Sequence, residues 1–502
     1  MHQEVEMCVI GKKVINLCNH SGIIDESCVR MYLEDYWSFP GGFQLPVIYG
    51  RRRVGKTALI RRFIQGKEAI FFTAIESSEQ QNLENLSRAI LAAAGSDASP
   101  VFQNFHDAFE YVFRKSLKKP LVLAVDEYPY LAKACPAVSS ILQKLIDEYK
   151  DQSQLFLILC GSSMSFMEEQ VLGYQSPLYG RRTAQLKILP FDFFEAREYF
   201  RHFSALDMAA VYGIVGGTPQ YLLQMDDSLS LEENLKEHLL DPACYLFEEP
   251  GNLLKQEIRE ASSYNAVISA IAGGASRLSE IADKTGLESS ACSGHLNKLM
   301  ALGLIRKEAP FGQHSTRKTI YAVADPLFRF WYRFIPKYIS LLQNGMVDPV
   351  CDRIMAQLPQ YMGPVFEDIC KQWLWRQNRC GTLPFFFTSL GRWWGSDPRT
   401  KSEAEIDIVA TGDEEDTLFC ECKWTQEAVD SGILTTLVTR SELIRSGRRH
   451  YMLFSRSGFT DGCRAKAEEM GNVRLMDFTA MLGEKIFFAT EDATEPAGIF
   501  GD

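Results

Sequence analysis

Short apolar runs alternate with longer helical stretches along the first 190 positions of the chain. The apolar runs are expected to form strands, and they lie at 45–49, 69–74, 121–125, 155–160 and 185–189. The runs at 121–125 and 155–159 are apolar at every position, which is typical of strands buried on both faces of a sheet. Strands that alternate with helices predict a parallel sheet with helices on both faces, and therefore an α/β fold.

Beyond residue 190 the periodicity is helical, and near residue 363 it changes again. After a leading helix, strands are expected near 384–390, 403–410 and 417–424. These changes divide the chain into an irregular lead-in with one helix (1–44), an α/β core (45–190), a helical region (191–253), a winged helix (254–324), a helical connector (325–362), a second α/β domain (363–489) and a disordered tail (490–502).

The first candidate site directly follows the strand at 45–49. Its sequence fits the P-loop pattern G-x-x-x-x-G-K-[ST], and a helical stretch comes next, as the motif requires. Glycine lets backbone N–H groups approach phosphate oxygens, Lys56 would reach the β- and γ-phosphates, and the Thr57 hydroxyl would ligate Mg²⁺. We therefore expect ATP and Mg²⁺ at this loop, whose binding residues are Gly50, Arg51, Arg52, Arg53, Val54, Gly55, Lys56, Thr57 and Ala58.

A second group of polar residues lies at the ends of later strands. Asp126 would hold the Mg²⁺ shell, and Glu127 would polarise the attacking water. Ser162 would touch the γ-phosphate or the water, or would cap the helix that follows. Arg181 and Arg182 would act as arginine fingers on the nucleotide of the same chain or of a neighbour in a homo-oligomer, or are plain surface arginines.

These motifs together resemble the archaeal-type ATPase family, a branch of the STAND/AAA+-like P-loop ATPases. The matching segments are Val47-Ile-Tyr-Gly-Arg-Arg-Arg-Val-Gly-Lys-Thr57, Val125-Asp-Glu127, Gly180-Arg-Arg182, Leu189-Pro-Phe191 and Gly216-Gly-Thr-Pro-Gln-Tyr-Leu222. The resemblance implies that residues 191–253 form a lid and that Thr218-Pro219 contacts adenine. By residue type alone this is a Gly-Gly-x-Pro turn that starts a helix. The Phe-x-Gly-Arg-Glu-like box that opens the family is matched poorly, by Cys8-Val-Ile-Gly-Lys-Lys13.

The predicted winged helix has two candidate roles. Its helices are expected at 278–286 and 289–302, and its wing strands at 303–307 and 318–323. In a DNA reader the second helix would enter the major groove, and basic wing residues would meet phosphates. Alternatively the module packs on the ATPase as an intramolecular lid, which the family resemblance favours. The wing residues in question are Arg306, Lys307, Arg317 and Lys318, and His295 on the second helix is expected to be structural.

The second α/β domain carries its own acidic pattern. Asp407 and Glu421 fall on adjacent predicted strands, and Lys423 shares a strand face with Glu421 because side chains alternate with period two. The pattern resembles the PD-(D/E)xK nuclease fold, in which Asp407, Glu421 and Glu367 of the leading helix would bind Mg²⁺ and Lys423 would assist catalysis. The alternative is an inert Lys–Glu pair on an edge strand. Cys420 alternates to the opposite face and is expected to be core.

Composition adds limits on partners and compartment. The 502 residues carry a net charge of −11, which argues against a protein that coats nucleic acid. The 13 cysteines include no C-x-x-C pair and suit a reducing, cytoplasmic environment. No apolar run approaches the roughly 18 residues of a membrane span, so no membrane partner is expected.

Two functions follow from these patterns. In the first, a Mg²⁺-dependent ATPase controls a C-terminal nuclease-like domain that acts on nucleic acid, DNA in preference to RNA. In the second, the protein is a nucleotide-switched regulator or scaffold whose nuclease-like fold only binds DNA or a partner protein.

Overall fold

A computed structural model describes residues 9–10, 13–14, 26–38, 42–93, 95, 101–258, 260–312, 318–412 and 416–483. The chain divides into two compact units, and each is described by itself. Unit 1 contains Met1–Phe191 and Thr218–Gln220, and unit 2 contains Asp192–Gly217 and Tyr221–Asp502. Most of the predicted lead-in and the whole predicted tail lie outside the described residues.

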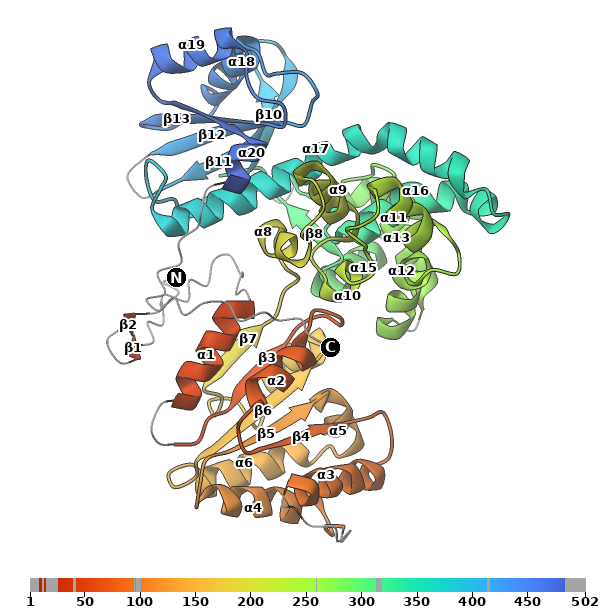
Figure 1. Cartoon of the computed structure of the whole chain (residues 1–502), viewed down its shortest axis with the longest axis vertical. Helices are drawn as coiled ribbons and strands as arrows, with labels where there is room; N and C mark the ends of the chain where they lie inside the picture. Colours follow the sequence, from red (N-terminus) through yellow and green to blue (C-terminus); the bar gives the residue numbers. More distant parts are fainter. Residues whose placement is uncertain are drawn as a thin grey trace. The chain divides into compact units, whose positions relative to one another are not determined.

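Unit 1 contains a five-stranded parallel sheet in the order β4-β5-β6-β3-β7 (Figure 1). The strands are β3 (Pro46–Tyr49), β4 (Ala69–Thr73), β5 (Leu121–Asp126), β6 (Leu155–Gly161) and β7 (Ala184–Lys187). All five correspond to predicted apolar runs. The order places β6 between β3 and β5, so the strand that leads into the P-loop and the strand that ends in Asp126 are not direct neighbours.

Helices cover both faces of this sheet, and each face has its own apolar core. Alternate residues of β3, β5 and β6 pack with α3 to α6 on one face and with α1 and α2 on the other. The helices are α1 (Glu26–Ser38), α2 (Lys56–Ile64), α3 (Glu79–Ala93), α4 (Phe105–Ser116), α5 (Tyr128–Ala134), α6 (Val138–Tyr149), α7 (Met164–Phe166) and the π-helical turn η1 (Met167–Val171). A short hairpin, β1 (Val9–Ile10) with β2 (Lys13–Val14), precedes them.

Unit 2 begins with the helices predicted for 191–253 and continues into three helices and a hairpin. The first set is α8 (Phe193–Ala196), η2 (Arg197–Tyr199), α9 (Ala205–Val215), α10 (Pro219–Leu222, shared with unit 1), α11 (Leu231–Leu235), η3 (Lys236–Leu240) and α12 (Tyr245–Glu257). The second set is α13 (Ala261–Ala272), α14 (Leu278–Thr285), α15 (Ser289–Ala301) and the antiparallel strands β8 (Ile305–Glu308) and β9 (Ile320–Val323). One apolar core joins α12 to α16 and this hairpin.

Two long helices follow the hairpin, and the second departs from the prediction. They are α16 (Pro326–Gln343) and α17 (Val347–Cys380). We expected a domain boundary between residues 362 and 363, but α17 continues through that point with Pro359 and Pro364 inside it. A Gly-Pro pair normally ends a helix. Here packing on one side with α9 and α16 and on the other with β11 and β12 keeps the helix continuous.

The second sheet belongs to unit 2 and is mixed, in the order β10-β11-β12-β13-β14. Its elements are β10 (Ser389–Asp397), β11 (Ser402–Thr411), β12 (Thr417–Lys423), α18 (Ser431–Ser441), β13 (Arg449–Ser455), α19 (Asp461–Met470), β14 (Val473–Asp477) and α20 (Phe478–Gly483). β10, β11 and β12 are antiparallel, whereas β12, β13 and β14 are parallel. The strand predicted near 384–390 is therefore wrong in position, because Gly391 and Gly395 lie inside a strand and do not interrupt it.

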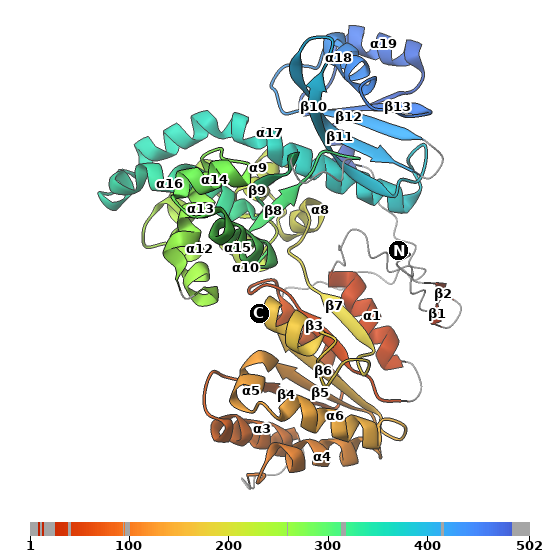
Figure 2. The same ribbon diagram turned by 180° about the vertical axis from the view of Figure 1, so that it is seen from behind.

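Helices also lie on both faces of the second sheet (Figure 2). α18 and α19 share an apolar core with Phe419 and Leu453 on one face. α17 covers the other face, where Trp373 packs edge-on against Phe454. Cys420 is buried there, as expected of a core residue. Among the described helices, none has both the length and the apolarity needed to cross a membrane.

Candidate nucleotide site and candidate nuclease centre

The P-loop turns tightly between β3 and α2. A Cβ at Gly50 would lie 2.3 Å from the carbonyl oxygen of Ile188, so only glycine fits at the start of the loop. Near its end, Arg53 and Gly55 have φ values of 72° and 90°, which lie in the left-handed region that favours glycine. This curl brings the loop backbone to the N-terminus of α2, where phosphate-binding loops place their amides.

Lys56 contacts the backbone of the P-loop, and Thr57 contacts the end of β5. The buried Lys56 donates from Nζ to the carbonyl oxygens of Gly50 and Arg51, both at 2.8 Å. Burial lowers the pKa of Lys56. Thr57 Oγ1 donates to Asp126 Oδ2 at 2.7 Å. The structure thus brings the loop and the end of β5 together, although β6 separates β3 from β5 in the sheet.

Glu127 and Ser162 also meet, from the ends of β5 and β6. Ser162 Oγ lies 2.8 Å from both carboxylate oxygens of Glu127, to which it donates. Ser163, not Ser162, is the N-cap residue of α7, and its side chain makes no capping bond. Ser162 therefore orients Glu127, and Glu127 itself sits at a left-handed φ of 52° that turns the chain at the strand end.

The Gly-Gly-Thr-Pro segment lies against the P-loop. Arg51 Nη2 donates to Thr218 Oγ1 at 3.1 Å, and both side chains are buried. A Cβ at Gly55 would lie 3.8 Å from Pro219 Cγ. Thr218 to Gln220 belong to unit 1, even though Gly217 before them and Tyr221 after them belong to unit 2. Pro219 is thus beside the loop, which is the position expected for a nucleotide contact.

Sequence reasoning missed two residues that support this site. Tyr130 on α5 accepts a hydrogen bond from Arg52 Nη2 at 2.9 Å. Cys160 on β6 lies beside Asp126 and Lys56, and burial followed by the charge of Asp126 raises the pKa of its thiol well above the usual value. Neither residue belongs to a recognisable motif, so the sequence carries no signal for them.

Arg181 and Arg182 do not point to the nucleotide loop of their own chain. They precede β7, whose first residue pairs with the start of β3, whereas the P-loop follows the end of β3. Arg181 makes a two-pronged pair with Asp147 at 2.7 and 2.9 Å, and Arg182 donates to the carbonyl oxygen of Leu172 at 2.7 Å. A finger role on the nucleotide of the same chain is therefore wrong. A role on a neighbouring subunit stays a prediction.

The acidic residues of the second sheet lie on neighbouring strands. β11 and β12 pair as far as Ile408 with Cys420, and Asp407 and Glu421 are the next residues on the two strands. Asp407 Oδ2 accepts from the backbone N–H of Cys422 at 2.8 Å, and Lys423 Nζ donates to Glu421 Oε1 at 2.7 Å. Both carboxylates are buried, and the structure brings Asp407, Glu421 and Lys423 to neighbouring positions on the two strands.

Electrostatics connects Glu367 on α17 to the same centre. Burial and then the negative charge of Asp407 raise the pKa of Glu367 to about 7. Burial also raises the pKa of Asp407, and burial together with Asp407 raises the pKa of Glu421. Buried carboxylates that repel one another in this way favour a proton or a cation among them.

The expected three-carboxylate metal site is, however, not fully closed. Among the His, Cys, Asp and Glu side chains of the described residues, one group of three has its ligand atoms within 4.8 Å of one another. Its members are His106, Asp107 and Glu110 on α4. The expectation that Glu367 closes a site with Asp407 and Glu421 is therefore not met in this arrangement. The reason is that Glu367 comes from a helix that packs across the opposite face of the sheet from α18.

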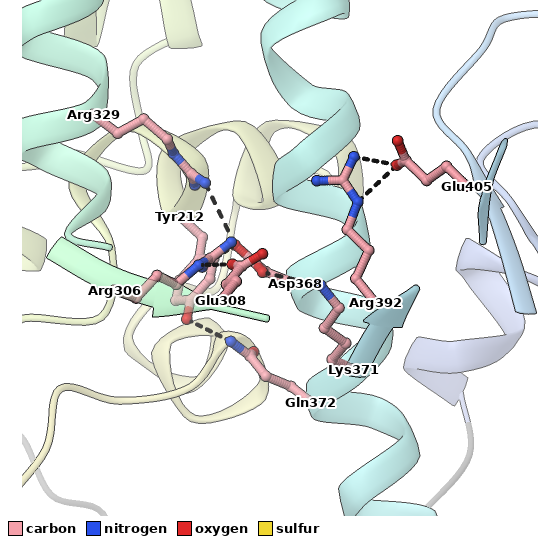
Figure 3. A network of polar contacts seen from close by, with 9 residues as sticks. All are labelled: Tyr212, Arg306, Glu308, Arg329, Asp368, Lys371, Gln372, Arg392 and Glu405. Carbon is pink, nitrogen blue, oxygen red and sulfur yellow. Dashed lines mark hydrogen bonds and ion pairs between the residues drawn. The ribbon is translucent and has the colours of Figure 1, made fainter. Parts of the chain in front are cut away.

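The wing residues are engaged within unit 2. Arg306 on β8 pairs with Glu308 and, through Nη1, with Asp368 Oδ2 of α17 at 3.1 Å (Figure 3). Of the two roles considered for the module, these intrachain ion pairs of Arg306 favour packing within the chain over contact with phosphate. Lys307 and Lys318 are exposed, and Arg317 lies outside the described residues. The ring of His295 hydrogen-bonds to Ala291 and Ser263, so the residue is structural as expected.

Comparison with known proteins agrees with both sites. Residues 37–225 match a family described as an ATPase domain predominantly from Archaea. An uncharacterized protein of Methanocaldococcus jannaschii is 33% identical over 384 residues, which are 76% of this chain and 83% of the relative. The chain belongs to this family of ATPases. A shorter uncharacterized protein of the same organism is 33% identical over 90 residues, 17% of this ATPase and 84% of the relative.

Two further families match the C-terminal part of the ATPase. Residues 386–483 match a restriction endonuclease family, and residues 331–433 match archaeal and bacterial proteins of unknown function. Among solved structures, a Walker-type ATPase of Pyrococcus abyssi is 20% identical with a TM-score of 0.47, and the match covers 62% of this chain and 96% of that one. The family matches at 37–225 and 386–483 show an ATPase with a C-terminal restriction-endonuclease-like domain.

Proposed function

We propose that this ATPase requires Mg²⁺ and that its nucleotide state controls a C-terminal nuclease that acts on nucleic acid, DNA in preference to RNA. The observation that carries the proposal is the convergence of P-loop, Asp126 and Glu127 in unit 1 together with the paired carboxylates of Asp407 and Glu421 in a domain of the restriction endonuclease family. Each site contains the donor set that phosphate chemistry needs.

The residues of the nucleotide site have separable roles. Lys56 would move from the loop carbonyls to the β- and γ-phosphates, since its ammonium already lies inside the loop. Thr57 and Asp126 would hold Mg²⁺, and the 2.7 Å contact between them shows that both oxygens reach one point. Mg²⁺ would neutralise charge on the phosphates. Glu127, oriented by Ser162, would accept a proton from the attacking water.

The residues of the nuclease centre also fit a divalent cation. Glu421 Oε2 is buried and has no hydrogen-bond partner among the described residues. A buried carboxylate oxygen without a partner is costly unless a proton or cation meets it. Asp407 and Glu421 would hold Mg²⁺, which would polarise the scissile phosphate. Lys423 would orient water or stabilise charge on the phosphate, and Glu367 would approach as a further ligand.

The intervening elements would connect the sites. We assign a lid role to residues 191–253 and a winged-helix role to α13–α15 with β8 and β9, in agreement with the three helices and hairpin of unit 2. Because Arg306 is paired within the chain, an intramolecular role of this module is favoured over DNA reading. The ten cysteines whose side chains the structure describes are free thiols, which suits a cytoplasmic protein.

A second candidate function has its own support. The ligand atoms of Glu367, Asp407 and Glu421 do not all lie within 4.8 Å of one another in the described structure. A fold of this class that fails to close its metal site would bind DNA or a partner protein without cleaving it. The protein would then be a nucleotide-switched regulator or scaffold.

One experiment separates these functions. Supercoiled plasmid is incubated with the full chain and Mg²⁺ or Mn²⁺, with and without ATP, and cleavage is followed on a gel. Cleavage by the wild type, its loss in Asp407→Ala and a change of rate with ATP are expected. Equal cleavage by wild type and Asp407→Ala would indicate a contaminant. Plasmid binding without cleavage by either protein would support the regulator instead.

A further inference from the structure

One turn of α17 carries two adjacent carboxylates that meet different surroundings. Glu367 lies near the candidate nuclease centre, where the charges of Asp407 and Arg392 act on it. Asp368, the next residue, lies among cations that belong to the helical part of unit 2 (Figure 3). Its carboxylate is approached by Arg306 Nη1 at 3.1 Å, Arg329 Nη1 at 3.4 Å and Lys371 Nζ at 3.8 Å.

We name these four residues the Asp368 cluster: Arg306 of β8, Arg329 of α16, and Asp368 and Lys371 of α17. The three cations approach the single carboxylate of Asp368 from three elements, within 3.1 to 3.8 Å. The Asp368 side chain is partly buried, and removing one partner from an ionic group that is shielded from water costs more than the net worth of the pair. The cluster therefore links the hairpin, α16 and α17 through ion pairs.

Two hydrogen bonds join the same stretch of α17 to α9, one on either side of Glu367. Before it, Tyr361 donates from its hydroxyl to the carbonyl oxygen of Gly213 at 2.7 Å. After it, Gln372 Nε2 donates to the hydroxyl of Tyr212 at 2.9 Å. The part of α17 that carries Glu367 is thus joined by polar contacts to the hairpin, α16 and α9, and on its other side it packs against β11 and β12, which present Asp407 and Glu421.

The chain runs directly from the end of α9 to Thr218, which contacts the P-loop. α9 ends at Gly216, whose φ is 71° and whose Cβ, if present, would lie 3.0 Å from the ring of Pro326. Gly217 is followed directly by Thr218, which accepts the hydrogen bond from Arg51 of the P-loop. A change at the loop therefore has a covalent route to α9, and α9 contacts α17 beside Glu367.

We propose that Asp368 is a positioning residue for the nuclease centre, through which the hairpin and α16 set the place of Glu367. The inference deepens the proposed function and rests on it, since it names the element that carries nucleotide control. It also accounts for the open arrangement of the three carboxylates, because the strands hold two of them while the helical elements hold the third. Movement of α17 relative to β11 and β12 would close or open the site.

The test compares Asp368→Asn with Asp416→Asn in the full chain. Asp416 is the control, since it is a buried carboxylate at the start of β12 that also contacts basic residues, Arg448 and His450. Mn²⁺ binding without nucleotide is measured by electron paramagnetic resonance, and Asp407→Ala identifies the part of the signal that belongs to this centre. Asp368→Asn is expected to weaken that binding about tenfold, as loss of a group that orients a metal ligand does. Asp416→Asn should leave it unchanged, and Asp368→Glu should restore it.

The second readout is the ratio of plasmid cleavage rates with and without ATP. In Asp368→Asn this ratio should move to one, whereas Asp416→Asn keeps the wild-type ratio. Wild-type Mn²⁺ affinity and a wild-type ratio in folded Asp368→Asn would overturn the inference and leave the proposed function intact. Unchanged Mn²⁺ binding and cleavage in Asp407→Ala would instead overturn the proposed function, and the inference with it.

Should Asp368→Asn fail to fold, Arg306→Gln tests the same cluster. This change leaves Asp368 with Arg329 and Lys371, so the partly buried carboxylate keeps two cations. The expected shift in Mn²⁺ affinity and in the ATP ratio has the same direction and is smaller. Wild-type values for both in Arg306→Gln would count against the inference.

Discussion

The two candidate sites use similar residues but hold them in opposite ways. At the P-loop, Lys56, Thr57 and Glu127 each have a partner within unit 1 at 2.7 to 2.8 Å. At the second sheet, Asp407 and Glu421 repel one another, and burial raises the pKa of both. The first site is arranged before any ligand binds, whereas in the second Glu367 of α17 does not close on the two carboxylates of the strands.

This difference teaches where control can act. A preorganised site changes little on binding and supplies electrostatic stabilisation without reorganisation. A site whose carboxylates come from a sheet and from a separate helix responds to any shift of that helix. The P-loop therefore suits sensing, and the centre at Asp407 suits a regulated output. The following changes test this contrast.

The largest effect is expected for Lys56→Ala. Its ammonium is the charge inside the loop, so its loss should lower the rate of ATP hydrolysis about 100-fold or more. Lys144→Ala, which removes an exposed lysine of α6, is the control and should hydrolyse ATP normally. A phosphate-release assay measures both, and a wild-type rate in Lys56→Ala would overturn the assignment of the site.

Gly50→Ala tests how tightly the loop is built. The added methyl would meet the Ile188 carbonyl oxygen at 2.3 Å, so we expect unit 1 to lose about 1–3 kcal/mol of stability. Urea unfolding gives the value. At the exposed Gly294 of α15 an added Cβ meets nothing within 4 Å, and alanine should stabilise by about 0.5–1 kcal/mol. Equal effects at the two glycines would contradict a tightly packed loop.

Ser162→Ala tests whether Glu127 needs its orienting partner. Loss of both 2.8 Å contacts should lower kcat for ATP roughly tenfold through misplacement of the base, with KM nearly unchanged. Ser163→Ala is the matched control, because the Ser163 side chain makes no capping bond. If both variants keep the wild-type kcat, Glu127 is held by other groups.

The smallest effect concerns the pH dependence of stability at the second site. The pKa of Glu367 rises from 4.5 to about 7 on folding, so its unfavourable contribution is absent below pH 4.5 and grows as pH rises to about 7. Glu367→Gln removes this contribution and should raise Tm by up to about 4 °C at pH 8, with little change at pH 4.5.

Calorimetry in the presence of a chelator measures this difference. The exposed Glu403 of β11 provides the control, since Glu403→Gln should show no such pH-dependent gain. An equal Tm shift for Glu367→Gln at both pH values would mean that Glu367 is not held near like charge, and the contrast between the sites would weaken.

The sequence alone determined the elements whose causes are local. The P-loop lies within one contiguous stretch from Gly50 to Thr57, so residue types and spacing suffice to identify it. The five apolar runs became the five strands of the first sheet, because a strand buried on both faces needs apolar residues at each position. The pairing of Asp407 with Glu421 followed from two nearby strands and their period.

Contacts between distant segments were decided only by the tertiary structure. Sheet order placed β6 between β3 and β5, and parallel register placed Arg181 at the edge opposite the loop. Packing kept α17 helical through Gly363-Pro364, which local propensity would have ended. Arg306 pairs with Asp368, which lies far along the chain, and this pairing favours a role within the chain over contact with phosphate. Local patterns specify what each segment can form, whereas burial and charge pairing between remote segments decide which partner each side chain meets.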